Sequence, residues 1–501
     1  MTAESGDAER SAFVEGLRDG RPQVLVRRIV DDVETPVSAY LKVGLGRRYA
    51  FLLESVEGGA VKGRYSILAM DPDIVWRCHG DRAELARDGA VAADRFELEP
   101  LPTVESLRAL IAAGRLALPE DLPPMAAGLF GVFGYDMVRL LEPLGEAPPD
   151  PLGLPDAVLT RPGLVAVFDS VGHEIIVTSA AYPDAGIDPN GAYEAALRRL
   201  DDFEAALARP LPSRPAAAAT EAPPLEAAID AAAFSDKVAR AQAYIEAGDI
   251  FQVVLSHRLQ APLTISPFAA YRSLRRQNPS PYLFYLDFGD FQLAGSSPEI
   301  LVRLKDGEVT IRPLAGTRPR GATPEADRAL ESELLADPKE RSEHLMLLDL
   351  GRNDVGRVSA PGSVEVTESF SIERYSQVMH IVSNVRGRAD PRIDAVDALL
   401  AALPAGTLSG APKVRAMEII DELEGQKRGV GYGGGVGYIS AGGEADICIV
   451  LRTLLFTQGQ AFVQAGAGVV ADSDPVMEYA ETLAKARAPM RALQEAWRFP
   501  A

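Results

Sequence analysis

Short runs of β-favouring residues separated by turn-forming residues dominate the first two hundred positions. Residues 23–28, 50–54 and 164–168 are such runs, and each predicts a β-strand. Apolar residues then recur at helical spacing over 195–209, which predicts a helix at the end of this part. The first half of the chain is therefore expected to be rich in strands, with few helices.

A proline- and alanine-rich stretch at 210–224 interrupts this pattern. Such a composition cannot build a core, so it predicts a linker. The following residues, 231–248, predict a helix that ends at a glycine. Beyond this helix the pattern predicts both element types: strands at 308–314, 436–440, 447–455 and 461–465, and helices at 340–350, 414–423 and 475–488.

These patterns predict an α+β fold built from large antiparallel or mixed β-sheets with peripheral helices. The predicted division of the chain is a disordered N-terminus at 1–20, an N-terminal domain at 21–209, a linker at 210–230 and a second domain at 231–495.

Composition narrows the class of protein. The chain has 501 residues, 47% of them hydrophobic, only two cysteines and a formal net charge of −20. A nucleic-acid-binding surface would need a basic stripe, and none is visible. The N-terminus does not resemble a signal peptide and no long apolar run occurs, so we expect a soluble, cytoplasmic protein with no membrane contact. An anionic substrate would need local positive charge.

Two pairs of glutamates are candidate metal ligands. Glu340 and Glu343 lie three residues apart on one predicted helix, and Glu478 and Glu481 on another. Residues at this spacing share a helix face, and Asp474 before a proline is a good N-cap for the second helix. Two such faces brought together would suit Mg²⁺, which takes few protein carboxylates. The alternative is two solvated helix faces, which is far more common.

Three further features could bind an anion. Arg452 lies in the predicted strand 447–455, where it would pair with a substrate carboxylate or with a structural acidic residue. The glycines at 466 and 468 could let backbone N–H groups approach an anion, or form a simple bulge. Thr407 precedes a helix for which Ser409 is the expected N-cap, and Lys413 lies near its start. No serine-hydrolase elbow or phosphate-binding loop is present.

In combination and order, these features resemble the chorismate-binding enzyme family. The matching stretches lie between about residues 245 and 490 and include GDIFQVVLS, AGSSPEILVR, PLAGTRPRG, KERSEHLMLLDLGRND, SQVMHIVS, GTLSGAPKVRAMEII, DICIVLRTLLF, VQAGAGVVADS and EYAETLAKARA. The N-terminal half matches more thinly, at FLLES and GLFGVFGYD. The resemblance implies a sandwich of antiparallel sheets with peripheral helices.

The resemblance also implies roles for individual residues. Mg²⁺ would be held by Glu343 and Glu481, with Glu340 and Glu478 in support. Chorismate would contact Gly316, Thr317, Tyr438, Arg452, Gly466, Ala467, Gly468 and Lys485. Glu299 would be the general acid, while His380 and Thr407 would serve the later elimination of pyruvate.

Two positions separate the members of this family. Gln252 stands where water-adding members carry a lysine base, and an amide cannot take a proton from water. Ala315 stands where aminodeoxychorismate-forming members carry a lysine nucleophile. The resemblance therefore favours direct attack by ammonia to form anthranilate, with aminodeoxychorismate synthesis as the alternative.

The resemblance further implies regulation and a partner. Five residues resemble a feedback site for L-tryptophan: Glu54, Ser55, Pro281, Tyr282 and Leu283. Neither cysteine resembles a glutamine-hydrolysing nucleophile, so a separate glutamine amidotransferase subunit is expected to supply ammonia. The other classes left open are an inactive tryptophan sensor and an acidic cation-binding interaction protein.

Overall fold

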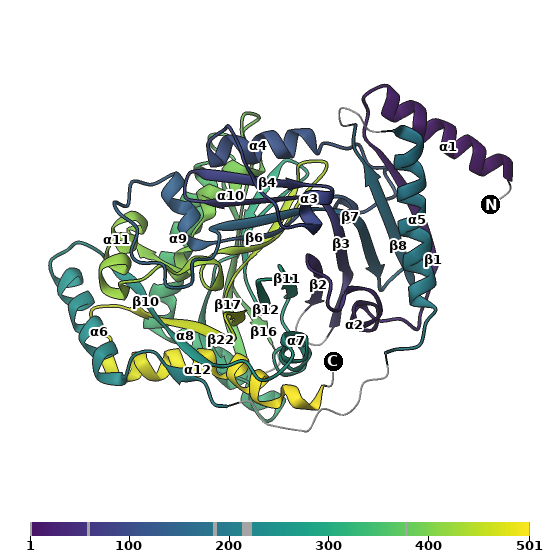
Figure 1. Ribbon diagram of the computed structural model, residues 1–501. Coiled ribbons are helices and arrows are strands. Elements are labelled where there is room, and N and C mark those ends of the chain that lie inside the picture. Colours follow the sequence, from purple (N-terminus) through teal and green to yellow (C-terminus); the bar gives the residue numbers. More distant parts are fainter. Residues whose placement is uncertain (1–2, 58–60, 184–187, 213–222, 376–377, 500–501) are drawn as a thin grey trace.

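The computed structural model describes residues 3–57, 61–183, 188–212, 223–375 and 378–499 (Figure 1). The α-helices are α1 (Ala3–Arg18), α2 (Pro36–Ala39), α3 (Gly89–Ala92), α4 (Thr103–Ala113), α5 (Pro189–Leu207), α6 (Ala231–Glu246), α7 (Pro267–Gln277), α8 (Pro324–Ala336), α9 (Pro338–Gly356), α10 (Ala395–Ala402), α11 (Lys413–Glu424) and α12 (Pro475–Glu495). No helix in these ranges is long and apolar enough to cross a bilayer.

Most strands belong to two large sheets. The first contains β1 (Gln23–Val30), β2 (Ala50–Glu57), β8 (Glu174–Ala181), β10 (Gln252–Pro262), β11 (Tyr282–Asp287), β12 (Phe291–Ser297), β21 (Thr453–Thr457) and β22 (Gln460–Val469). The second contains β4 (Arg82–Arg87), β6 (Gly128–Phe133), β13 (Ile300–Lys305), β14 (Glu308–Ile311), β15 (Leu314–Pro319), β16 (Glu365–Arg374), β17 (Val378–Arg388), β19 (Gly435–Ser440) and β20 (Ala445–Ile449). Two-residue strands at the margins are β5 (Glu97–Leu98), β9 (Glu226–Ala227) and β18 (Gly410–Ala411).

Two long strands, β3 (Val61–His79) and β7 (Ala157–Asp169), run from one sheet into the other. β3 pairs with β2 through its first half and with β4 through its second half. β7 pairs with β8 at one end and with β6 at the other, and its register with β3 shifts between Pro72 and Ile74. Strands that bend through such irregularities form the corners of a two-sheet sandwich.

Alternation along the strands places one apolar core between the sheets and others outside them. In β11, Phe284 and Leu286 pack in the same cluster as Val436 of β19 and Phe130 of β6, which belong to the opposite sheet. The intervening Tyr285 packs with the cluster that contains α7. Successive side chains of a strand point to opposite faces, so each sheet is buried on both sides.

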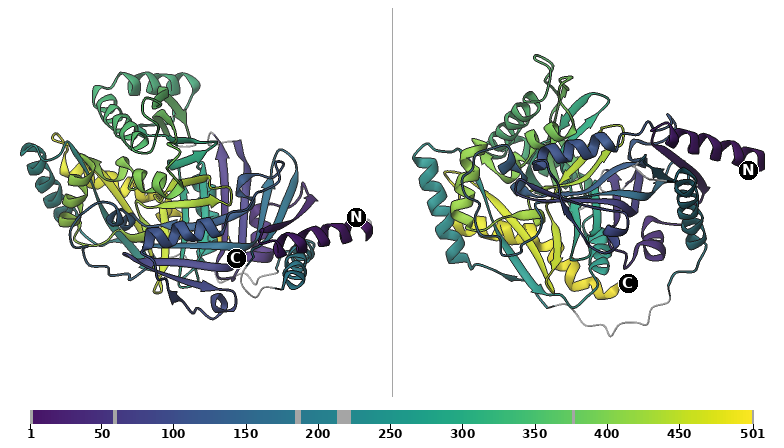
Figure 2. Two further views of the ribbon diagram at one scale, coloured as in Figure 1. Left: turned by 90° about the horizontal axis from the view of Figure 1, so that it is seen from above. Right: turned by 45° about the horizontal axis from the view of Figure 1, so that its top comes forward.

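Helices cover the outer faces of the sandwich (Figure 1). The residues of α5, α7 and α12 pack on one face, and those of α4 and α10 pack on the other. α8 and α9 lie with β15–β17 in a lobe that projects from the rest of the molecule (Figure 2). The α+β sandwich is therefore confirmed, and every strand pairing in the described ranges is antiparallel rather than mixed.

The expected division of the chain needs correction. Residues 3–18 form α1 instead of a disordered segment, because Phe13, Val14 and Leu17 are buried against α5. The strands of the two predicted domains hydrogen-bond to each other, since β2 pairs with β11 and β6 pairs with β19. Part of the predicted linker is also structured: β9 pairs with β10, while residues 213–222 lie outside the described ranges.

Candidate active site

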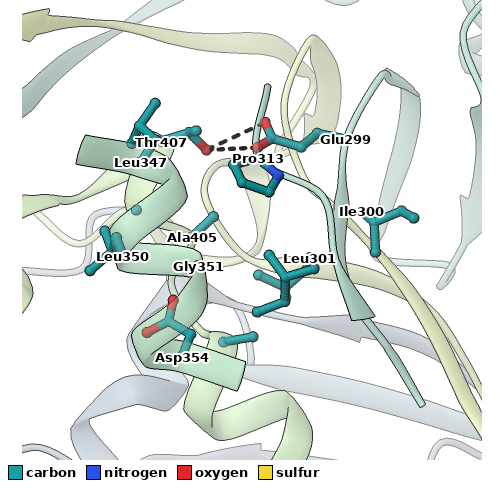
Figure 3. A pocket seen from close by; sticks show the side chains of 13 residues that line it. Glu299, Ile300, Leu301, Pro313, Leu347, Leu350, Gly351, Asp354, Ala405 and Thr407 are labelled. Carbon is teal, nitrogen blue, oxygen red and sulfur yellow. Dashed lines mark hydrogen bonds between the residues drawn. The ribbon is translucent and has the colours of Figure 1, made fainter. Parts of the chain in front are cut away.

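Glu299 lies between β12 and β13 at one end of a small cavity (Figure 3). The residue is 6% exposed, and both carboxyl oxygens lie 3.3 Å from the Thr407 hydroxyl, which donates to them. Apolar side chains such as Leu301, Pro313 and Leu347 form the walls of the cavity, and Asp354 lies at its far end. The structure thus brings together Glu299 and Thr407, two of the predicted catalytic residues.

Burial controls the protonation of Glu299. Loss of solvent raises the pKa of this carboxyl to about 8, against the opposing effects of the Thr407 hydrogen bond and the positive charges of Arg452 and Lys485. A carboxyl with such a pKa is mostly protonated at neutral pH. Glu299 can therefore donate a proton, which is the behaviour required of a general acid.

His380 lies on β17 opposite Thr317 of β15. Its Nδ1 is 3.0 Å from the Gly316 carbonyl and 3.0 Å from the Thr317 hydroxyl. Because a carbonyl only accepts, Nδ1 carries the proton and donates it to Gly316. The buried Nε2 has no partner among the described residues, and burial lowers the pKa of the ring to about 3. His380 is therefore a neutral imidazole with a free acceptor nitrogen.

Arg452 lies in the connection between β20 and β21, not inside one continuous strand as predicted. Its φ of 49° is in the left-handed region, which interrupts the ladder and turns the residue away from the strand direction. Burial lowers the pKa of its guanidinium, while Tyr375 and Glu299 oppose this effect. No acidic side chain in the described part of the chain forms an ion pair with Arg452. A half-buried arginine without a carboxylate partner is suited to an anionic ligand.

The four predicted metal ligands lie on α9 and α12, and Asp474 caps α12 as predicted. Burial raises the pKa of Glu343, with further rises from Glu340 and Glu481 opposed by Lys485. This mutual influence indicates that the two helices bring these carboxylates close together. Glu343 accepts a hydrogen bond of 3.5 Å from Gln252, whereas Lys485 pairs with Glu481 at 2.7 Å.

Within the described ranges, no group of three or more acidic, histidine or cysteine side chains is arranged to hold a metal ion. Mg²⁺ needs fewer, because water and substrate oxygens complete its shell. The buried Oε2 of Glu478 has no hydrogen-bond partner, which leaves one carboxylate oxygen available. Glu340, by contrast, already accepts from Arg318 at 2.9 Å. The donor set fits a dication held by two carboxylates.

Close backbone approach explains the glycines at 466 and 468. A Cβ on Gly466 would lie 2.7 Å from the Tyr432 hydroxyl, and one on Gly468 would lie 2.5 Å from Nε2 of Gln252. Lys485 donates to the Gly466 carbonyl at 3.1 Å. Gly466, Ala467 and Gly468 therefore belong to β22. This segment packs against residues that face α9 and α12, the two helices that carry the glutamates.

A second, larger cavity of about 730 Å³ lies next to the first, since Ile300 lines both. All five residues of the predicted tryptophan site line it: Glu54, Ser55, Pro281, Tyr282 and Leu283. Glu54 is already paired, because Arg275 donates to it at 2.7 and 2.9 Å and Tyr271 also donates to it. Tyr282 donates to Asp446 at 3.0 Å. The expected grouping is thus present, with its acidic residue neutralised from within the chain.

Tyr438 corrects the predicted substrate set. It lines the large cavity with Ser55 and Tyr282, and is absent from the cavity at Glu299. Tyr432, six residues earlier, is the tyrosine whose hydroxyl lies against Gly466. The negative charge of Glu481 contributes to raising the pKa of Tyr432, after the larger effect of burial. The sequence analysis named Tyr438 as the substrate-binding tyrosine, whereas the structure places Tyr432 next to the predicted substrate segment at Gly466.

The helix after Thr407 also starts later than predicted. Ser409 donates to the Ala405 carbonyl and does not cap α11, whose N-cap is Pro412. Lys413 pairs with Asp354 at 2.8 Å, so its charge is used inside the protein. The predicted end at Gly425 is confirmed, with φ of 69°.

Tyr375 is a further residue that no motif indicated. It lines the large cavity, and its ring meets the His380 ring edge-on at 5.6 Å between centroids. Its hydroxyl donates to Glu373 at 2.7 Å. A buried tyrosine between two sites is visible only in three dimensions, because nothing local to its sequence marks it.

Comparison with known proteins agrees with this geometry. The family model described as chorismate binding enzyme matches residues 73–491. Anthranilate synthase component 1 of Cereibacter sphaeroides is 54% identical over 97% of this chain and 98% of its own length. The Pseudomonas putida protein of the same name is 48% identical, over 92% of this chain and 93% of its own.

Solved structures give the same result. Anthranilate synthase component I from Streptococcus pneumoniae TIGR4 superposes with a TM-score of 0.76 at 39% identity, covering 93% of this chain and 99% of that chain. The menaquinone-specific isochorismate synthase from Escherichia coli shares the fold, with a TM-score of 0.70 at 18% identity over 97% of this chain and 100% of that chain. From its matching residues and its relatives, this chain belongs to the chorismate binding enzyme family.

Proposed function

We propose that this chain is the chorismate-using component of anthranilate synthase, which converts chorismate and ammonia into anthranilate, pyruvate and water. The observation that carries the proposal is a buried, protonated Glu299 close to an arginine that has no carboxylate partner within the described chain. Chorismate is a dicarboxylate with a ring hydroxyl that must leave. The arginine suits a carboxylate and the neutral glutamic acid suits the leaving hydroxyl.

Mg²⁺ would be held by Glu343 and Glu481, with Glu478 and Glu340 in support, and when bound would draw electron density towards the ring carboxylate. Lys485 lies four residues after Glu481 and pairs with it. The lysine and the glycine segment 466–468 would bring further positive potential to a dianion in an otherwise acidic protein.

The first half of the reaction forms a C–N bond and breaks a C–O bond. Arg452 holds one carboxylate of chorismate, and ammonia attacks C2 of the ring. The double bonds shift, the C4 hydroxyl leaves, and Glu299 gives it a proton so that it departs as water. Thr407 donates to the conjugate carboxylate of Glu299 and stabilises the charge that develops there.

The second half removes a proton from C2 and pyruvate from C3. His380 offers a neutral ring with a free Nε2, so it can accept this proton. Its Nδ1 hydrogen bond to Gly316 fixes the tautomer in which Nε2 is the acceptor. The C2–H electrons form the C2=C3 double bond that makes the ring aromatic, and the enolpyruvyl group leaves as the enolate of pyruvate, which takes up a proton.

Two neighbouring positions support ammonia as the nucleophile. Gln252 is 3% exposed and lies against Gly468 and Glu343, where its amide supplies no base for water. Ala315 in β15 supplies no nucleophile of its own. A separate glutamine amidotransferase subunit is proposed as the ammonia source, since both cysteines are buried and have raised thiol pKa values.

The large cavity is proposed to bind L-tryptophan as a feedback inhibitor. Tyr282 would pack on an indole ring, and the hydroxyl groups of Ser55 and Tyr438 would hydrogen-bond the polar groups of the ligand. Because Glu54 is already paired with Arg275, the ammonium group of the ligand would rely on other acceptors in the cavity.

One assay tests the proposal. The purified chain is incubated with chorismate, an ammonium salt and Mg²⁺, and products are identified by mass. Anthranilate and pyruvate, lost on adding EDTA and reduced by tryptophan, are expected. A product that keeps the enolpyruvyl group would instead identify 4-amino-4-deoxychorismate synthesis, and no turnover would contradict the enzyme assignment.

A further inference from the structure

Arg428 is the most deeply buried arginine beneath the catalytic centre. It follows the end of α11, and its side chain is 1% exposed. Nε donates to Glu424 at 3.0 Å, and Nη2 also donates to this carboxylate. Glu424 in turn accepts from the backbone N–H and the hydroxyl of Ser256, at 2.7 and 2.8 Å. This charge is neutralised inside the protein, so Arg428 is not free to bind an anionic substrate.

The remaining donors of Arg428 reach two backbone carbonyls. Nη1 donates to Leu408 at 2.6 Å, and Nη2 donates to Val254 at 2.8 Å. Leu408 follows Thr407, whose hydroxyl donates to Glu299. Val254 lies two residues after Gln252, which donates to Glu343. One guanidinium is thus bonded to the segments that carry two of the site residues.

The faces of the same guanidinium lie against two rings. Its carbon is 4.8 Å from the centre of the Tyr135 ring and 5.2 Å from that of Tyr432. Tyr432 places its hydroxyl against Gly466. Tyr135 belongs to the N-terminal half, where the neighbouring Asp136 accepts from the Gly429 backbone at 3.0 Å. Arg428 therefore also links a third site segment to the N-terminal half.

We propose that Arg428 is a positioning residue that holds the Thr407 turn, the strand of Gln252 and the ring of Tyr432 in one arrangement around the substrate. Only arginine can do this, because its planar group offers five donors in a rigid fork and two faces for aromatic rings. A lysine would keep the charge beside Glu424 but could not bond both carbonyls and both carboxylate oxygens at once. The inference rests on the proposed function of these three segments.

The test compares Arg428→Lys with a matched control, Arg139→Lys. Arg139 also forms partly buried ion pairs, with Asp136 and with Asp421 of α11, but has no bond to a site segment. Arg428→Lys is expected to lower kcat by about tenfold to a hundredfold, as small displacements of reacting groups do. The KM for chorismate should change far less, because Arg452 and the acidic helices are untouched. Arg139→Lys should keep kcat within about threefold of the parent.

The pH profile separates positioning from general weakening of the fold. The Thr407 hydrogen bond lowers the pKa of Glu299, so a displaced Thr407 lets that pKa rise. The alkaline limb of kcat/KM should therefore move upward in Arg428→Lys, in the same direction as in Thr407→Val. In the double variant the two shifts should not add.

Folding is monitored by thermal unfolding. If Arg428→Lys does not fold, Arg428→Gln combined with Glu424→Gln removes both charges of the pair and is assayed in the same way. An unshifted alkaline limb with parental kcat, or an equal loss in Arg139→Lys, would overturn the proposal. Product identity in the parent chain is measured separately, so a wrong enzyme assignment is distinguishable from a wrong role for Arg428.

Discussion

The two cavities differ in how an arginine interacts with a neighbouring glutamate. Arg275 donates twice to Glu54 beside the large cavity, and this pair is complete without a ligand. Arg452 influences Glu299 without forming an ion pair, and Glu299 has its pKa raised to about 8. The first arrangement is a complete ion pair within the protein, whereas the guanidinium of Arg452 has no carboxylate partner among the described residues.

The same contrast extends to the neighbouring groups. Around the large cavity, Asp446 is paired with Arg303 and Glu373 with Arg312, and one buried nitrogen, Nε of Arg312, has no hydrogen-bond partner in the described chain. Around the catalytic centre, Nε2 of His380 and Oε2 of Glu478 are buried without partners in the described chain. Buried polar groups without partners cost stability, and such groups collect where a ligand or reaction uses them. This difference supports the proposal that the chemistry takes place near Glu299 and that the large cavity recognises an overall neutral ligand.

Replacing Arg452 should have the largest effect. Arg452→Met is expected to lower kcat/KM for chorismate by about a thousandfold, because a charge aimed at the substrate is lost from a water-poor site. Stability should not fall, because no partner is left unpaired in the protein. Steady-state kinetics and thermal unfolding measure both.

Arg275→Met is the matched control for that experiment. It leaves the buried Glu54 carboxylate without its arginine, so the melting temperature should fall and tryptophan inhibition should weaken. Its effect on kcat/KM should be far smaller. A reversed pattern, with the greater catalytic loss in Arg275→Met, would contradict the assignment of the two cavities.

Glu299→Gln should have the next largest effect, a loss of about a hundredfold in kcat, because the amide cannot donate the required proton. In the parent, activity should fall as pH rises through about 8, where Glu299 loses its proton. This alkaline limb should disappear in the variant. A persistent limb would assign it to another group.

The same residue predicts a stability change whose sign follows from its raised pKa. The folded protein holds the proton of Glu299 up to about pH 8, whereas an unfolded chain releases it near the ordinary value of 4.5. The stabilisation is complete below pH 4.5 and is lost as pH rises to about 8. The parent should therefore lose on the order of 5 kcal/mol relative to Glu299→Gln between these limits, by urea unfolding at each pH.

Ser55→Phe tests the large cavity directly. The larger ring fills part of the cavity next to Tyr282, so the inhibition constant for tryptophan should rise at least about tenfold. Turnover should be unchanged, because Ser55 does not line the cavity at Glu299. Ser55→Ala, which removes only the hydroxyl, should have a smaller effect. Full inhibition of Ser55→Phe would exclude tryptophan binding at this position.

Local signals predicted one part of the site well and another part poorly. The helices carrying the four glutamates were predictable because caps and spacing are local: Asp337 and Asp474 accept from the first N–H groups of α9 and α12. The position of Arg452 could not be predicted, because its left-handed backbone interrupts an apolar run whose pattern is typical of one continuous strand. The sequence analysis did not predict α1, because the apolar face of this helix becomes buried only when it packs against α5.

The choice between Tyr432 and Tyr438 depended on strand pairing. Both lie in one glycine-rich run, and the sequence has no signal for which of them faces the substrate. In the fold, Tyr438 of β19 lies opposite Phe130 of β6 and points into the space between the sheets. Tyr432 precedes β19 and contacts β22. Long-range contacts of this kind determine where a side chain lies in the fold, and a sequence motif alone does not.

This pair of tyrosines provides the smallest and most discriminating test. Each Tyr→Phe change removes one hydroxyl, which is worth about two- to tenfold in a binding constant. Tyr432→Phe should lower kcat/KM for chorismate and leave tryptophan inhibition unchanged, because its hydroxyl lies against Gly466. Tyr438→Phe should do the reverse, because its ring lines the large cavity. If Tyr438→Phe alone lowered kcat/KM, the two cavities would not be separate sites.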